Sequence, residues 1–161
     1  MNTIVIKNAT CMDVPILLNF IKELADYEKL SSEVIATEKA ITETLFGEQC
    51  YAEALIAHKG NQAAGFALFF HTYSTFLAQP GLHLEDLYVK PQWRNQGIAK
   101  QLLIHLAQLA KQRKCGRIEW SVLKWNKSAI KFYQRINALP LDQWMTFRLA
   151  NEALDKLAQQ K

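Results

Sequence analysis

A short basic segment that contains a glycine has the residue types and spacing for anion chemistry. Leu87-Tyr88-Val89 ends a predicted strand, and Arg94-Asn95-Gln96-Gly97-Ile98-Ala99 leads into a predicted helix. The first amides of a helix lack internal partners and lie at the positive end of its dipole, so they bind phosphate groups. Gly97 and Ala99 leave the backbone accessible, and Arg94 and Lys100 add mobile positive charge. The pattern R-x-x-G-x-A predicts a pyrophosphate site, but a helix cap beside a surface arginine has the same pattern.

A second segment, Trp125-Asn126-Lys127-Ser128-Ala129-Ile130-Lys131-Phe132-Tyr133, starts another predicted helix. Asn126 is a suitable N-cap, and Tyr133 lies two turns later on the face that carries Ala129 and Ile130. Both helices follow predicted strands, so their N-termini can open on one crevice. Taken alone, this segment also fits a capped amphipathic helix whose Phe132 and Tyr133 are core residues.

The elements that must position these segments follow from hydrophobic periodicity, caps and turn residues. The spacing predicts strands over 3–7, 52–58, 63–73, 82–89 and 117–123, and helices over 13–27, 37–47, 97–113 and 127–136. Lys59-Gly60-Asn61-Gln62 is a hairpin turn, and Pro80-Gly81 is expected to break the chain. A final hairpin of 139–141 and 146–149 precedes a short polar helix from Asn151. Strand 82–89, helix 97–113 and strand 117–123 form a crossover unit, which is expected to be parallel and right-handed.

Composition bounds the class of protein. The 161 residues suffice for one domain, 1–161, and half of them are apolar with 21% charged, which is typical of a soluble globular chain. No apolar run is long enough for a membrane span, and the N-terminus lacks the apolar region of a signal peptide. Cys11, Cys50 and Cys115 are widely spaced, which indicates reduced thiols in the cytoplasm and no disulfide or metal framework. The four histidines are likewise isolated, so we expect no metal site.

The order of these motifs resembles the GNAT-type N-acetyltransferases. It runs L-E-D-L-Y-V, R-x-x-G-x-A, W-N-x-x-A-x-x-F-Y and a final hairpin, and the likeness extends to Lys22-Glu23-Leu24-Ala25-Asp26-Tyr27-Glu28, so it covers about residues 4–149. The match is most similar to the diamine and polyamine (spermidine/spermine) acetyltransferases and their thialysine-acetylating relatives. The resemblance implies an α+β fold with a mixed, mostly antiparallel, splayed sheet, acetyl-CoA in its notch, and a homodimer.

The resemblance also implies residue roles. The pantetheine arm of acetyl-CoA would contact the backbone of Leu87, Tyr88 and Val89, and would pass Asn126, Ser128 and Ala129. The pyrophosphate would lie on Asn95, Gln96, Gly97, Ile98, Ala99 and Lys100, with Arg94 beside it. Tyr133 matches the general acid, and Tyr27, Glu28, Glu85, Glu119, Trp120 and Ser121 match substrate-site positions. Asn95 and Asn137 replace glycines that are usual in these families, and asparagine tolerates positive φ, so both turns are expected to survive.

These residue types suit acetyl transfer to an amine. An alkylamine with a pKa near 10.4 is only about 0.04% neutral at pH 7, and only the neutral amine is a nucleophile. A carboxylate near the amine can attract the ammonium form and accept its proton, which generates the nucleophile. Glu85 is the candidate base, and strand alternation predicts that Asp86 points to the opposite face. Tyr133 can protonate the leaving thiolate, and no cysteine lies in the motifs, which favours direct transfer in a ternary complex.

Other functions fit parts of the sequence. We expect a small (poly)cationic amine such as a diamine or a polyamine as the acceptor, and an amino acid, a peptide amine or an aminoglycoside is the alternative. A domain that binds acyl-CoA without turnover is a second class, which the presence of Tyr133 disfavours. The net charge of +4 and the cluster Lys111, Arg113, Lys114 and Arg117 raise the possibility of nucleic-acid binding, but a solvated basic patch explains them better. We expect a small-molecule amine as the partner, and neither nucleic acid nor membrane.

Overall fold

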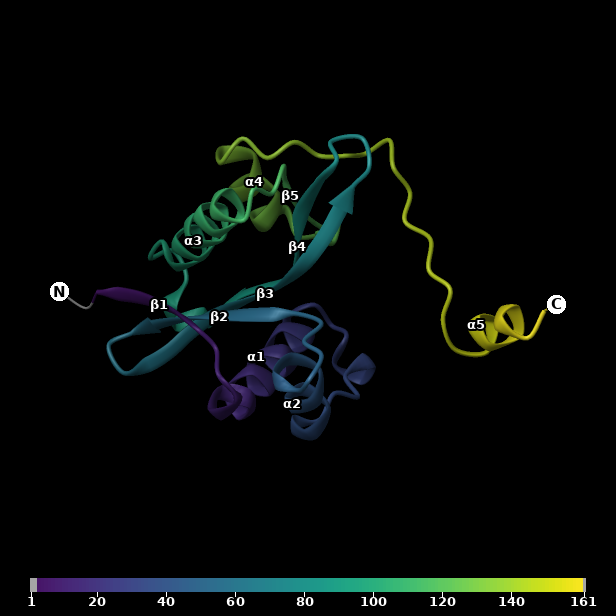
Figure 1. Ribbon diagram of the computed structural model, residues 1–161. Coiled ribbons are helices and arrows are strands. Elements are labelled where there is room, and N and C mark those ends of the chain that lie inside the picture. Colours follow the sequence, from purple (N-terminus) through teal and green to yellow (C-terminus); the bar gives the residue numbers. More distant parts are fainter. Residues whose placement is uncertain (1–2, 161) are drawn as a thin grey trace. The chain divides into compact units, whose positions relative to one another are not determined.

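A computed structural model describes residues 3–160 of the chain (Figure 1). It contains two compact units, Met1–Leu123 and Lys124–Lys161. The first holds the strands β1 (Ile4–Asn8), β2 (Glu53–Lys59), β3 (Gln62–Ser74), β4 (Gln79–Val89) and β5 (Ile118–Trp120). Its helices are α1 (Val14–Tyr27), α2 (Glu38–Phe46) and α3 (Ile98–Gln112), with the 3-10 turns η1 (Cys11–Asp13), η2 (Ser31–Glu33) and η3 (Pro91–Trp93). The second holds α4 (Lys127–Arg135) and α5 (Asn151–Ala158).

The five strands form one sheet in the order β1-β2-β3-β4-β5. Neighbours from β1 to β4 are antiparallel, and β5 joins β4 in parallel after the chain has passed through α3. The parallel pairing expected of the crossover unit and the mixed, mostly antiparallel sheet are therefore confirmed. Figure 1 shows α1 and α2 on one face of this sheet and α3 on the other.

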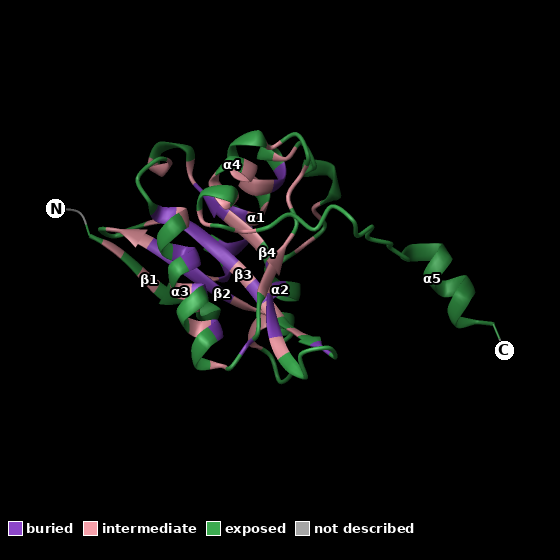
Figure 2. Cartoon of the chain, turned by 90° about the horizontal axis from the view of Figure 1, so that it is seen from above, coloured by how far each residue is buried: buried purple, intermediate pink, exposed green. Residues whose placement is uncertain are grey.

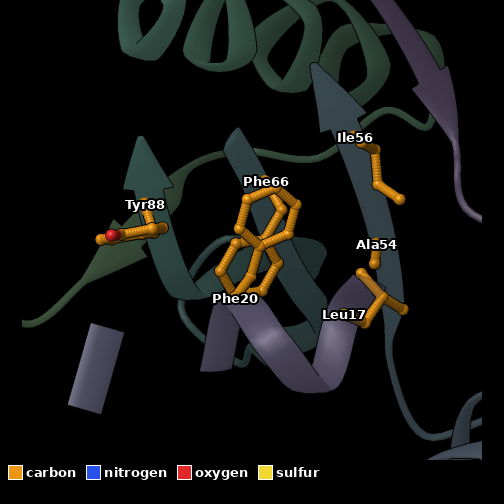
Figure 3. Packing of buried hydrophobic residues seen from close by; sticks show 6 residues of the cluster. All are labelled: Leu17, Phe20, Ala54, Ile56, Phe66 and Tyr88. Carbon is orange, nitrogen blue, oxygen red and sulfur yellow. The ribbon is translucent and has the colours of Figure 1, made fainter. Parts of the chain in front are cut away.

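The face under α1 is built on a small aromatic core. Phe20 of α1 stacks on Phe66 of β3 with 5.2 Å between ring centroids, and Tyr88 of β4 meets Phe20 edge-on at 6.1 Å. Leu17, Ala54 and Ile56 complete the cluster (Figure 3). Buried residues concentrate on the central strands, as Figure 2 shows, so α1 and β4 are held together by apolar packing.

Helix α3 is fixed on the opposite face by packing and by charge. Ile98, Leu102 and Leu106 are buried on its inner side. At its end, both terminal nitrogens of Arg113 donate to the carboxylate of Glu53 in β2, at 2.5 and 2.7 Å. This bidentate pair holds the pKa of Glu53 below its ordinary value, chiefly through the hydrogen bonds themselves. The buried side chains and the Arg113–Glu53 pair thereby fix α3, which connects β4 to β5, against the sheet.

Three strand predictions were wrong in extent or existence. Pro80 and Gly81 do not break the chain but lie near the start of β4, paired with Tyr73 and Thr72, because proline is tolerated at a strand's first residues. Strand β5 is shorter than predicted, at three residues. The hairpin expected over 139–141 and 146–149 is not formed within the described chain, whose residues 136–150 hold no strand.

The second unit contains the predicted capped helix. The side chain of Asn126 accepts a hydrogen bond from the Ala129 amide at 3.2 Å, which confirms the N-cap of α4. Helix α5 begins at the predicted Asn151. Between them, large apolar side chains are exposed, namely Leu139, Leu141, Trp144, Met145, Phe147 and Leu149.

Candidate active site

Strands β4 and β5 pair over a very short stretch. The parallel ladder joins only Leu82–Leu84 to Ile118–Trp120, while β4 continues to Val89 beside β3. Beyond Leu84, the β5-side edge of β4 has no strand partner among the described residues. An unpaired strand edge offers amides and carbonyls to an extended ligand. The predicted pantetheine residues Leu87, Tyr88 and Val89 lie on this edge, with the side chains of the last two buried.

The loop between β4 and α3 has the backbone that a phosphate cradle needs. Asn95 and Gly97 both adopt positive φ, at 60° and 81°. The expectation that asparagine would tolerate this turn is therefore confirmed, and Asn137 is also in this region at 62°. A Cβ on Gly97 would meet no protein atom within 4 Å, so its outer side is open to a ligand.

The neighbouring residues divide into accessible and buried groups. Ile98 has 1% of its surface exposed, so only its backbone is available to a ligand. Lys100 is exposed, and Ala99 is half-buried. The side chain of Gln96 is held by Lys59, which also lies 4.7 Å above the ring of Trp93. The loop is thus braced from the β2–β3 hairpin.

Arg94 differs from its predicted role as a mobile charge. Its Nε donates to the carbonyl of Val89 at 3.0 Å. Its guanidinium carbon lies 4.7 Å from the ring centroid of Tyr27 and 5.7 Å from that of Tyr88. Both tyrosines belong to the side of the sheet that α1 covers. The guanidinium is therefore anchored on that side by cation–π contacts and a hydrogen bond.

A cluster of carboxylates lies on the same side, because the strand is irregular there. The register passes from Leu68 opposite Asp86 to Phe69 opposite Leu84, so Glu85 is the extra residue of a β-bulge. The prediction that Asp86 and Glu85 point to opposite faces assumed regular alternation and was wrong. Their charges, together with that of Glu28 at the end of α1, act on one another.

The pKa of Asp86 is raised to about 7, chiefly by burial and then by the charges of Glu85 and Glu28. Burial also raises the pKa of Glu28. A carboxylate with a pKa near neutrality is suited to accept a proton from an ammonium group. Asp86 was not predicted as a site residue, although two consecutive acids in an otherwise apolar strand could have indicated a bulge.

His83 was not predicted as a site residue either. Its Nε2 lies 3.5 Å from a carboxylate oxygen of Glu85, and its ring packs on Phe70 with centroids 5.0 Å apart. In the parallel ladder it is the neighbour of Glu119, whose carboxylate pairs with Arg117 at 2.9 Å. Glu119 therefore has a permanent counter-ion in Arg117, whereas the neighbour of Glu85 is a histidine, which is charged only when protonated. Trp120 is half-buried in β5, and Ser121 follows it exposed.

The remaining predicted residues belong to the second unit. Tyr133 is half-buried on α4, and its ring lies 5.4 Å from that of Phe132. Ser128 and Ala129 occupy the first turn that Asn126 caps. The local arrangement matches the predicted motif helix.

No cluster of three or more metal-ligating side chains occurs among residues 3–160. None of the helices in this range has the length and apolar character that a bilayer crossing requires.

Known proteins share this arrangement. The model of the acetyltransferase (GNAT) family matches residues 20–138. A thialysine N-epsilon-acetyltransferase of Caenorhabditis elegans is 39% identical over 88% of this chain and 89% of its own. A human spermidine/spermine N(1)-acetyltransferase-like protein is 31% identical over 95% of this chain and 23% of its own.

The structural comparison gives the same grouping. An integron cassette protein of Vibrio cholerae has a solved structure with a TM-score of 0.83, at 26% identity and 99% coverage of both chains. The five-stranded sheet, the glycine-containing loop before α3 and the family match agree with one another. This chain belongs to the GNAT family and is an acetyl-CoA-dependent N-acetyltransferase.

Proposed function

We propose that this enzyme acetylates a primary amine on a small substrate that carries a second positive charge. The observation that carries the proposal is the carboxylate cluster of Glu28, Glu85 and Asp86 beside the open edge of β4. Several carboxylates in one partly buried place stabilise a cation, and more than one of them favours a substrate with more than one charge.

Two acceptor classes fit this cluster. A thialysine-like amino acid is the first candidate, since the C. elegans relative acts on thialysine and matches most of both chains. A diamine or a polyamine such as spermidine is the second, and it is supported by the three acids and by the human spermidine/spermine acetyltransferase-like relative. Both classes place one amine for attack and a second cation several bonds away.

Each group of residues has a separate role in the proposed reaction. Glu85 and Asp86 attract the ammonium group, and Asp86 or Glu85 takes its proton, so that the free amine is the nucleophile. The donor supplies a thioester carbonyl. The backbone of Leu87, Tyr88 and Val89 binds its arm, while Asn95 to Lys100 bind its pyrophosphate. In the second unit, Tyr133 is the general acid for the leaving thiolate, and Asn126, Ser128 and Ala129 are donor contacts.

At the level of the whole protein, we propose a single acetyltransferase domain that works as a homodimer in the cytoplasm. Six large apolar side chains exposed between α4 and α5 support self-association, because surfaces of this kind usually mark an interface. Three free cysteines fit a reducing compartment.

The function is tested by following CoA release from acetyl-CoA with thialysine, lysine, spermidine, a straight-chain diamine and a monoamine of equal length. We expect turnover with amines that carry a second charge and a much weaker reaction with the monoamine. Glu28→Gln should raise the KM of the doubly charged amines about 5–30-fold, leave kcat similar and leave the monoamine unaffected. An equal effect on both kinds of amine would rule out selection of a second charge, and no turnover with any amine would contradict the proposal.

A further inference from the structure

The arginine of the R-x-x-G-x-A motif lies on an unexpected side of its loop. Helix α3, of which Gly97 is the N-cap, covers the face of the sheet opposite to α1 (Figure 1). The guanidinium of Arg94 instead lies over Tyr27, the last residue of α1, and over Tyr88, which packs against Phe20 under α1. The Arg94 side chain therefore connects the loop between β4 and α3, where acetyl-CoA is expected to bind, to the face that carries Glu28, Glu85 and Asp86.

Rather than a ligand of the donor's pyrophosphate, we propose that Arg94 is a positioning residue for the amine acceptor. It holds Tyr27 against the end of β4 and so fixes the last turn of α1, from which Glu28 follows. The inference rests on the proposed amine acceptor, because its effect is read through acceptor binding.

The contacts of Arg94 make a continuous clamp across this junction. Its Nε donates a hydrogen bond to the carbonyl of Val89 at 3.0 Å, and this bond orients the guanidinium plane. Burial raises the pKa of the Tyr88 hydroxyl, and Glu23 of α1 and Arg94 act on it in opposite directions. Glu23 in turn lies 3.8 Å from Lys90, and that ammonium group lies 5.4 Å from the Phe20 ring centroid. Arg94 is thus tied directly to α1 at Tyr27, and to β4 at Tyr88 and at the carbonyl of Val89.

The position of Glu28 makes this clamp relevant to the acceptor. Glu28 is the C-cap of α1, where the backbone leaves the helix and Lys29 adopts a φ of 62°. A helix end frays readily unless side chains hold it. If the Arg94–Tyr27 contact is lost, Glu28 is free to move away from Asp86 and Glu85. The acceptor's second charge then loses its partner, while the amides of residues 95–100 still bind phosphate.

Two donors separate the two roles. Acetyl-CoA has the pyrophosphate, and S-acetylpantetheine lacks it. Arg94→Ala should raise the KM of a doubly charged amine by about 5–30-fold with either donor and change kcat little. Lys100→Ala, in the same loop, is the matched control and should impair the reaction with acetyl-CoA only. Arg94→Lys keeps the cation over the ring and should recover part of the loss.

The clamp also predicts a coupling to its aromatic partner. Tyr27→Leu should raise the amine KM in the same way, and its effect should not add to that of Arg94→Ala, because each variant breaks the same contact. Calorimetric titration of the folded variants with the amine and with CoA reads both affinities independently of turnover. If Arg94→Ala instead weakens CoA binding, and its kinetic defect disappears with S-acetylpantetheine, Arg94 is a pyrophosphate ligand and the clamp is overturned. Absence of wild-type turnover contradicts the proposed function alone, and amine titration then decides the clamp.

Discussion

Asp86 links the chemistry of the site to the stability of the fold. Its pKa in the folded protein is about 7, against an ordinary value of 3.8 for an aspartate. Between these values the folded state binds more protons than the unfolded state, so this group lowers stability as the pH rises from about 4 to about 7. The cost then stays constant at higher pH. A half-buried acid that opposes folding in this way fits a group retained for its charge and not for its packing.

Asp86→Asn should therefore stabilise the protein at pH 8 and reduce its activity. The expected gain in the free energy of unfolding is between about 1 and 4 kcal/mol, since each unit of pKa difference corresponds to about 1.4 kcal/mol. Urea denaturation at pH 4.5 and pH 8 measures it, and the gain at the lower pH should be about a quarter of the gain at pH 8. Asp142→Asn, at an exposed carboxylate, is the control. A gain that is independent of pH would show that ionisation of Asp86 is not its source.

The role of Tyr133 as general acid is the second prediction about a single residue. Tyr133→Phe removes the hydroxyl and keeps the ring that lies beside Phe132, so its effect on the melting temperature should be small. If the hydroxyl protonates the thiolate, kcat should fall by about 10²–10⁴-fold with little change in acetyl-CoA affinity. Tyr73→Phe, at an exposed tyrosine, should have neither effect. Near-normal turnover of Tyr133→Phe would mean that water or another group is the acid.

At the scale of elements, the turn before α3 leaves the first backbone amides of the helix accessible. Gly97 has a φ of 81°, and a Cβ there would be open to the outside. Gly60, in the β2–β3 turn, has a φ of 59° and is equally free of neighbours. The two glycines therefore carry the same backbone strain when replaced, but only one lies where a phosphate is expected.

Gly97→Ala and Gly60→Ala should each lower the free energy of unfolding by about 1–2 kcal/mol. Only Gly97→Ala should also weaken acetyl-CoA, because its methyl group would occupy the anion's place above the first amides of α3. Titration calorimetry with acetyl-CoA, next to thermal unfolding, separates the two effects. Equal affinities in the two variants would contradict the assignment of the pyrophosphate to this loop.

At the scale of the whole molecule, the donor and a second copy should both act on stability. Acetyl-CoA at a hundredfold excess over its Kd should add about 2.7 kcal/mol, or a melting shift of about 5–10 °C for a chain of this size. Light scattering coupled to size exclusion should give the mass of a dimer. Phe147→Asp, at a side chain that is 88% exposed, should weaken the dimer without lowering the stability of the separated chain. A wild-type monomer at micromolar concentration would contradict the homodimer.

Much of this protein follows from the sequence by itself. The helices α1, α2, α3 and α4 begin and end within a few residues of their predicted limits, because apolar periodicity, Thr37, Asn126 and Gly47 act locally. The left-handed turns at Asn95 and Asn137 were predictable for the same reason, since they depend on one residue type. The motif order was sufficient to identify the GNAT family.

The tertiary structure decided what depends on contacts between distant residues. The bulge at Glu85 comes from the register of β3 against β4, and it brings Asp86 into the acid cluster that regular alternation had excluded. Arg94 stacks on Tyr27 because α1 ends beside the end of β4. The predicted C-terminal hairpin lacks strand partners in the described chain, although its residues alternate suitably. Propensity and spacing are local, whereas strand register, burial and charge coupling depend on which elements the fold brings together.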